Sequence, residues 1–307
     1  AIMADLGREY GIPIFSYGAN ASQLSSAINY PWFLRVVSPS EYYEGYLIDL
    51  AAHFKIDQIA YFHTTDPWGI GANKVIQQST KNKNIRIIKK YSFPRDTSQS
   101  VIDEYVKETA ILNVQNIVIT TPTPDTVKIF KAIHKFGINK PGNTLFAAEM
   151  LIDYEDDAAV LGSIGYFAPI VRLPQSILLT EYIEDLKNFS HEELNVESAN
   201  FIYSALSYDH IMLIANTILL IKKDKKPVTR TNLRDYMRSV SFTGITGNIS
   251  YSTSSNDRLN TPIQIMNSHG ADSNGAMNFV KIAEVNQKTG QLDIDEDKIL
   301  WPGGISN

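Results

Sequence analysis

The chain has 307 residues, of which 44% are hydrophobic and 20% are charged, and it contains no cysteine. This composition excludes disulfides, thiolate metal sites and a cysteine nucleophile, while the length allows a core that is stable without them. The formal net charge of −5 and the pI of about 5.7 argue against nucleic-acid binding, which needs a basic face. The longest apolar run, residues 211–221, contains Asn216 and is shorter than the roughly 20 residues of a membrane span.

Apolar runs that predict strands alternate with amphipathic stretches that predict helices through the first half of the chain. The expected strands are residues 12–17, 33–37, 58–63, 85–91, 116–120 and 143–148. The expected helices are residues 3–10, 40–54, 71–80, 101–112 and 124–136. This alternation is typical of parallel βαβ units, so we expect an α/β fold with a doubly wound, mostly parallel sheet.

The pattern loosens after residue 150 and ends in a β-rich tail. We expect a strand at residues 164–171, helices at 177–187, 198–219 and 232–240, and strands at 247–252, 262–267 and 279–285. The sequence shows no internal repeat, low-complexity tract or linker. We therefore expect the second half to return to a sheet that the first half begins.

The first residues of the chain and its one basic run give little information about location or partners. Residues 1–6 (AIMADL) lack the basic region that opens a signal peptide, so we expect either an intracellular protein or an interior piece of a longer one. The only concentrated basic run, residues 222–226 (KKDKK), is typical of a solvated surface.

The sequence contains few motifs that indicate enzymatic or metal chemistry. The chain has no P-loop, HExxH or GxSxG motif, and the single GxG at residues 69–71 lacks the third glycine of a dinucleotide site, so we expect a loop there. The six histidines are not at metal spacing, and the acidic clusters at 153–157 and 293–297 lack the EF-hand pattern and are typical of solvated turns. We expect no catalytic residue, metal or cofactor, although one sequence does not exclude a Ser-His-Asp site assembled in three dimensions.

Several stretches nevertheless resemble one known family, in order and with sensible spacing. In the first half they are residues 11–17 (GIPIFSY), 21–25 (ASQLS), 30–41 (YPWFLRVVSPSE) and 66–69 (DPWG). In the second half they are Tyr208-Asp209 and residues 242–251 (FTGITGNISY), 256–258 (NDR), 263–267 (IQIMN) and 299–304 (ILWPGG). They are similar to the receptor-family ligand-binding region, which has the two-lobed type I periplasmic-binding-protein fold. Its members include ectodomains of class C G-protein-coupled receptors, glutamate-receptor-like proteins and natriuretic-peptide receptors.

This resemblance implies two lobes, each a doubly wound, mostly parallel sheet flanked by helices. Residues 1–38 would belong to lobe 1 and residues 39–150 to lobe 2. Residues 151–307 would return to lobe 1 with crossover strands and the β-rich C-terminal tail. The family normally has further strands of lobe 1 before the point where this chain starts, so lobe 1 would be partial.

The resemblance also implies a function. The chain would be the extracellular, non-enzymatic ligand-binding module of a membrane receptor that clamps an amino acid or similar small amine between its lobes. It would form a homo- or heterodimer through lobe 1, reach the membrane through a segment outside this chain, and need no cofactor and no nucleic acid. Two alternatives stay open, namely a structural or assembly module with a degenerate cleft and a soluble amino-acid-binding protein of an ABC transporter. The absence of cysteine departs from many receptor relatives, which carry disulfides.

The ligand-binding positions of the family carry over to five residues. Asn20 falls on a hydroxyl position, Glu41 and Glu149 on acidic positions, Trp68 on an aromatic position, and Lys226 on a lysine position for a distal carboxylate. Two carboxylates and an indole suit an ammonium group.

Each of these positions also has a structural alternative. The alternatives are a helix first-turn acid for Glu41, a packed aromatic for Trp68, a surface acid at a strand end for Glu149 and a solvated side chain for Lys226. Three glycosylation sequons begin at Asn20, Asn188 and Asn248. A glycan on Asn20 would occlude the cleft, so the two interpretations of that residue compete.

Overall fold

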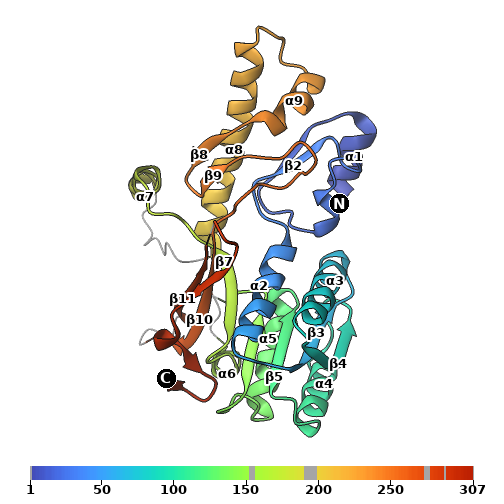
Figure 1. Cartoon of the computed structure of the whole chain (residues 1–307), viewed down its shortest axis with the longest axis vertical. Helices are drawn as coiled ribbons and strands as arrows, with labels where there is room; N and C mark the ends of the chain where they lie inside the picture. The colour runs from blue at the N-terminus through green and yellow to red at the C-terminus, as the bar shows by residue number, and fades with distance from the viewer. Residues whose placement is uncertain (1, 152–155, 190–198, 273–276, 287, 307) are drawn as a thin grey trace. The chain divides into compact units, whose positions relative to one another are not determined.

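The structure is a computed structural model that describes residues 2–151, 156–189, 199–272, 277–286 and 288–306, without the side chains of residues 40, 41, 199 and 200. The chain forms two compact units (Figure 1). Unit 1 comprises Ala1–Ser40 and Val171–Pro262, and unit 2 comprises Glu41–Ile170 and Ile263–Asn307. The chain therefore passes from one unit to the other three times.

This division differs in one respect from the lobes that the sequence predicts. Residues 1–40 and 41–150 separate close to the predicted boundary. The segment 151–307, however, does not return to lobe 1 as a whole. Residues 151–170 and 263–307 belong to unit 2, because strands from both segments lie in the sheet of that unit.

A mixed sheet of eight strands forms the centre of unit 2, in the order β12-β11-β10-β7-β6-β5-β3-β4. The strands β4, β3, β5, β6 and β7 pair in parallel, whereas β10, β11 and β12 pair antiparallel. The bounds are β3 (Gln58–Thr64), β4 (Arg86–Phe93), β5 (Asn116–Thr120), β6 (Thr144–Ala147), β7 (Phe167–Val171), β10 (Ile263–Ala271), β11 (Met277–Val285) and β12 (Leu292–Ile294). The predicted α/β fold with a mostly parallel central sheet is confirmed.

Helices cover both faces of this sheet (Figure 1). Their bounds are α2 (Ser40–His53), α3 (Pro67–Asn82), α4 (Gln99–Ile111), α5 (Thr123–Lys135) and α6 (Asp157–Gly162). Residues of α2 and α3 share a buried cluster with Tyr61 of β3. On the other face, Phe62 of β3 lies 4.6 Å from the ring of Tyr91, which stacks on Tyr105 of α4. Since neighbouring strand residues point to opposite faces, the sheet of unit 2 is doubly wound.

The first turn of α3 corrects one prediction. The sequence predicts a loop at residues 69–71, which is wrong, because α3 begins at Pro67 with Asp66 as its N-cap. A Cβ added to Gly69 would lie 2.1 Å from the carbonyl oxygen of Thr64. Glycine is therefore needed for the helix to start this close to the carboxyl end of β3.

Unit 1 is built mainly from helices and short strands. The strands β1 (Ile14–Ser16) and β2 (Phe33–Arg35) pair in parallel, and β8 (Phe242–Gly244) and β9 (Gly247–Ile249) form an antiparallel hairpin. The helical elements are α1 (Ile2–Tyr10), η1 (Ser22–Ser25), α7 (Ile177–Phe189), α8 (Ala199–Lys223), α9 (Arg230–Tyr236) and η2 (Met237–Ser239). Among its described residues, unit 1 thus carries a two-stranded parallel sheet and not the larger doubly wound sheet that the resemblance implies for each lobe.

The helix α8 contains the longest apolar stretch of the chain. By length and composition alone, residues Phe201–Lys223 could cross a membrane. However, Asp209 in this helix is fully buried, and its carboxylate accepts hydrogen bonds from the backbone N–H groups of Ile245 and Thr246, both at 2.8 Å. The buried carboxylate therefore ties one face of α8 to the hairpin of the same unit, whereas only 33% of the apolar stretch is buried.

Candidate functional site

Polar side chains gather where the parallel strands of unit 2 end. Thr64 and Thr120 are the last residues of β3 and β5, and Glu149 follows β6 by two residues. Ligands of doubly wound sheets bind beyond the carboxyl ends of the strands, because loops and helix N-termini converge there. This edge of the sheet is therefore the candidate site in unit 2.

An ion pair joins two of the loops at this edge. Arg95, which follows β4, donates to Oδ2 of Asp66 from Nε at 2.9 Å and from Nη2 at 2.5 Å, and Thr64 donates to Oδ1 at 2.6 Å. Burial would raise the pKa of Asp66, but the hydrogen bonds from Thr64 and Arg95 outweigh it and lower that pKa. The carboxylate of Asp66 is thus ionised and already neutralised within unit 2.

Glu149 differs from Asp66 in this respect. Within the described residues, its half-buried carboxyl group has no hydrogen-bond or ion-pair partner. Burial raises the pKa of Glu149 to about 7, although the positive charge of Arg95 opposes the change. Near neutral pH this carboxyl group therefore lies between its two protonation states, and a cation beside it would favour the ionised one.

The other two predicted residues of unit 2 lie at helix starts. Trp68 is the second residue of α3 and is only 9% exposed, and in the described part of the chain its indole Nε1 has no hydrogen-bond partner. Glu41 is the second residue of α2, but its side chain lies outside the described residues. Trp68 and Glu149 thus follow strands β3 and β6 at the same edge of the sheet.

In unit 1, a loop follows β1 at the carboxyl end of that strand and contains Asn20. The hydroxyl oxygen of Ser16 accepts hydrogen bonds from the backbone N–H groups of Gly18 at 3.3 Å and Ala19 at 2.9 Å. Asn20 is half-buried, and among the described residues no acceptor binds its backbone N–H or that of Ala21. These two N–H groups and the Asn20 amide are available to an anionic group.

Aromatic rings border the same loop. Tyr17 is 42% exposed, and its ring centroid lies 5.9 Å from the imidazole of His210 on α8. Burial lowers the pKa of His210, so this imidazole is neutral at neutral pH. The resemblance did not identify either ring.

Lys226 lies away from this loop. It follows the end of α8 by three residues, is exposed, and has its Nζ 5.0 Å from the ring centroid of Tyr236. A hydrogen bond with Tyr236 raises the pKa of Lys226. From His210 to the last residue of α8 is about 20 Å along the helix axis at 1.5 Å per residue, so the structure does not bring Lys226 beside Asn20.

The structure also locates two of the sequons and part of one acidic cluster. Asn188 is exposed near the end of α7, and Asn248 is exposed in β9. In the acidic cluster 153–157, residues 153–155 lie outside the described residues, and Asp156 caps α6 by accepting from the backbone N–H of Ala159 at 3.1 Å. Nowhere in the described ranges do three or more histidine, aspartate or glutamate side chains form a group that could hold a metal ion.

Arg95 is the residue of the unit 2 edge that the sequence interpretation missed. The family motif that carries Trp68 begins at Asp66, but Arg95 lies 29 positions further along the chain in an unremarkable loop. Its position after an expected strand was the available signal, because every loop that follows a parallel strand lies at the ligand-binding edge.

Comparison of the sequence with known proteins places this chain in a family. The family model described as "Receptor family ligand binding region" matches residues 1–271. The metabotropic glutamate receptor-like protein E of Dictyostelium discoideum is 22% identical over 307 residues, which cover 96% of this chain and 36% of that protein. Metabotropic glutamate receptor 4 of Rattus norvegicus is 23% identical over 300 residues, which cover 80% of this chain and 33% of the receptor.

The chain spans about a third of the length of these curated relatives. The family match covers most of the chain and agrees with the resemblance that the sequence motifs indicate, including the distant similarity to metabotropic glutamate receptors. The family is one of receptor ligand-binding regions, which are typically non-enzymatic. The chain belongs to the receptor family ligand binding region.

Proposed function

We propose that the chain is the extracellular sensor of a membrane receptor and that it clamps an amino acid or similar small amine between two lobes. The observation that carries this proposal is Glu149, a half-buried carboxyl group at the ligand-binding edge of unit 2 with no partner of its own among the described residues. Burying an unpaired carboxyl costs stability, which is typical of groups kept for a ligand.

An amino acid carries groups that suit both the carboxyl edge of the sheet in unit 2 and the loop after β1 in unit 1. Its ammonium group would pair with Glu149 and with Glu41, next to the indole of Trp68. Its carboxylate would accept hydrogen bonds from the Asn20 side chain and from the backbone N–H groups of Asn20 and Ala21. Asp66 is a weaker candidate for the ammonium, because Arg95 already neutralises it.

Units 1 and 2 would act as the two lobes. Their three connecting segments would form the hinge through which closure on the ligand is transmitted. By resemblance, unit 1 would mediate dimerisation and a segment outside this chain would reach the membrane. Asn188 and Asn248 are exposed and suit glycans, whereas at Asn20 a glycan would compete with ligand binding.

Binding tests this proposal directly. The full-length protein is heated with each of the twenty amino acids and with GABA at millimolar concentration, and its unfolding temperature is followed. A ligand present at 100 times its Kd adds about 2.7 kcal/mol to the free energy of unfolding. We expect at least one amine to raise the unfolding temperature, and stabilisation by none of them would refute the sensing function.

Trp68 favours a second candidate, a structural module whose cleft is no longer used. Trp68 is only 9% exposed, so less of its ring face is free for a ligand than an open site would offer. This candidate predicts no stabilisation by any amine. It also predicts that Trp68→Ala destabilises the protein as a core substitution does, by about 3–5 kcal/mol.

A further inference from the structure

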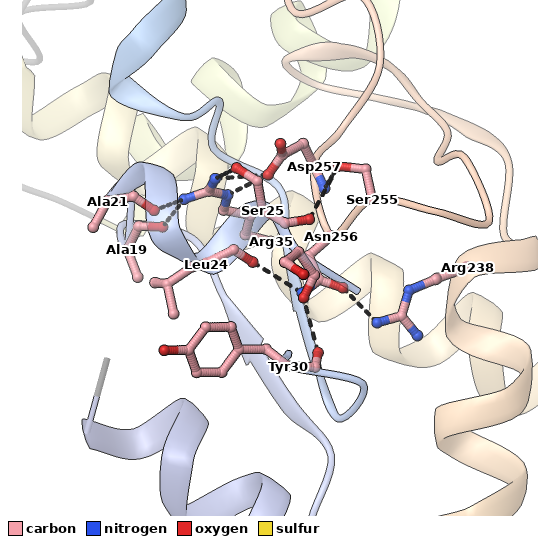
Figure 2. A network of polar contacts seen from close by, with 11 residues as sticks. Ala19, Ala21, Leu24, Ser25, Tyr30, Arg35, Arg238, Ser255, Asn256 and Asp257 are labelled. Atoms are coloured by element: carbon pink, nitrogen blue, oxygen red, sulfur yellow. Dashed lines mark hydrogen bonds and ion pairs between the residues drawn. The ribbon is translucent and has the colours of Figure 1, made fainter. Parts of the chain in front are cut away.

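A buried arginine organises the loop that carries Asn20. Arg35 is the last residue of β2, and its side chain is fully buried. Its Nη1 donates to the carbonyl oxygens of Ala19 and Ala21, both at 2.9 Å, and its Nη2 donates to the hydroxyl of Ser25 at 2.8 Å (Figure 2). The guanidinium is therefore hydrogen-bonded to the residues on both sides of Asn20 and to the last residue of the short helix η1.

The charge of this arginine is balanced from a segment more than 200 residues away. Asp257 accepts from Nε of Arg35 at 2.8 Å and lies 2.6 Å from Nη2. A buried guanidinium without a counter-ion would be costly, so Asp257 is what allows Arg35 to sit beneath the loop. Only the planar fork of arginine can serve the two carbonyls, the hydroxyl and the carboxylate at once.

Neighbouring residues fix Asp257 in place. The Asn256 amide donates to the carbonyl oxygens of Leu24 at 2.9 Å and Tyr30 at 3.1 Å, and its carbonyl oxygen accepts a hydrogen bond from Arg238 (Figure 2). The segment 255–257 is thus tied to the end of the loop at Leu24 and to the chain after the loop at Tyr30. We call Arg35, Asn256 and Asp257 the loop clamp.

The clamp determines which backbone groups the loop presents. Arg35 draws the carbonyl oxygens of Ala19 and Ala21 inward. The backbone N–H groups of Asn20 and Ala21 donate to no described acceptor. Without the clamp the carbonyl oxygen of Ala19 would need another partner, and that of Ala21 would keep only the backbone N–H of Leu24 at 3.1 Å. The loop would then no longer hold one conformation.

We propose that Arg35, anchored by Asp257, is a positioning residue that holds residues 17–25 in the conformation competent for ligand binding. Its effect on a ligand rests on the proposed function, whereas its effect on the loop does not. A ligand's apparent Kd rises in proportion as the competent fraction of the loop falls. A tenfold drop in that fraction would therefore weaken binding tenfold.

Hydrogen–deuterium exchange of the full-length protein tests the effect on the loop. The variants are Arg35→Lys, which keeps the charge but loses the fork, and Asp257→Asn, which keeps the shape but loses the counter-charge. We expect peptides covering residues 17–25 to exchange at least tenfold faster in both variants, with peptides covering β3 and β5 of unit 2 unchanged. The milder Asp257→Asn decides the result if Arg35→Lys does not fold.

Arg258→Lys is the matched control. Arg258 is also buried in unit 1, but its side chain donates to Thr246 and to the carbonyl oxygen of Asn248 rather than to the loop. We expect this control to lower the unfolding temperature without faster exchange in residues 17–25. Equal acceleration in the control, or none in Asp257→Asn, would overturn the proposal.

The thermal-shift panel of twenty amino acids and GABA adds a binding readout. Any amine that stabilises the wild-type protein should bind Asp257→Asn at least tenfold more weakly and Arg258→Lys with unchanged Kd. Unchanged affinity in Asp257→Asn would contradict the positioning role. If the wild-type protein responds to no amine, the proposed function fails, while the exchange experiment still decides whether the clamp holds the loop.

Discussion

Replacing Glu149 by glutamine should stabilise the ligand-free protein at pH values above about 4.5 and leave its stability unchanged near pH 4.5. Burial raises the pKa of Glu149 from its ordinary value of 4.5 to about 7. At about 1.4 kcal/mol per pH unit, this difference corresponds to about 3 kcal/mol. Because the side chain is half-buried and partly screened by water, we expect about 2 kcal/mol.

The sign follows from proton binding. The folded protein binds the Glu149 proton more tightly than the unfolded chain does, so the free energy of unfolding falls as pH rises from about 4.5 to about 7 and this contribution is constant above that range. Glutamine has no proton to lose. Glu149→Gln should therefore match the wild-type protein near pH 4.5 and exceed its stability by about 2 kcal/mol at pH 8.

Urea denaturation at a series of pH values measures this difference. Subtracting the wild-type free energy of unfolding from that of the variant at each pH cancels the contributions of all other titrating groups. Glu104→Gln, which makes the same substitution at an exposed glutamate of α4, is the matched control. A stability difference for Glu149→Gln that stays the same from pH 4.5 to pH 8 would refute the argument from burial.

Two further substitutions test the fold. Gly69→Ala places a Cβ 2.1 Å from the carbonyl oxygen of Thr64 and should lower the free energy of unfolding, measured by urea denaturation, by at least about 2 kcal/mol. Its control, Gly45→Ala in α2, meets nothing within 4 Å and should be neutral or stabilise by up to about 1 kcal/mol. Equal effects of the two substitutions would contradict the close approach of α3 to β3. Asp209→Ala leaves three buried donors without their acceptor and should cost about 3–5 kcal/mol, whereas the exposed Asp185→Ala should change stability by less than about 0.5 kcal/mol. A small loss of stability for Asp209→Ala would show that α8 is not held by the hairpin.

The parallel sheet of unit 2 could be predicted because its signals are local. Residues 116–120 are a continuous apolar strand in the sequence and form β5 with the same bounds. Its neighbours differ from prediction by a few residues at their ends, where periodicity carries little information. Doubly wound topology then follows from the alternation of strands and helices.

The start of α3 could not be predicted from local preference. Glycine is a poor helix former, so two glycines close together indicate a loop. The structure places Gly69 in the first turn of α3 because the carbonyl of Thr64 leaves no space for a side chain. A tertiary contact thus outweighs the helix propensity.

The candidate site was predictable only in part. The family motifs identify Trp68 and Glu149, which the structure places at one edge of the sheet of unit 2. They also contain Arg35 and Asp257, but a motif alone does not distinguish a ligand contact from a buried support. That distinction depends on burial and on hydrogen-bond partners far apart in sequence, such as the pair formed by these two residues.

The most direct test of the central claim is calorimetric titration of the full-length protein with the amine that stabilises it most. The titration is performed at pH 7 in two buffers of different ionisation enthalpy. An ammonium group that pairs with Glu149 should displace its proton, and with a pKa of about 7 roughly half a proton should leave per ligand bound. The account predicts this release in the wild-type protein and its loss, with at least tenfold weaker binding, in Glu149→Gln. Binding without proton release, or equal affinity in the variant, would contradict it.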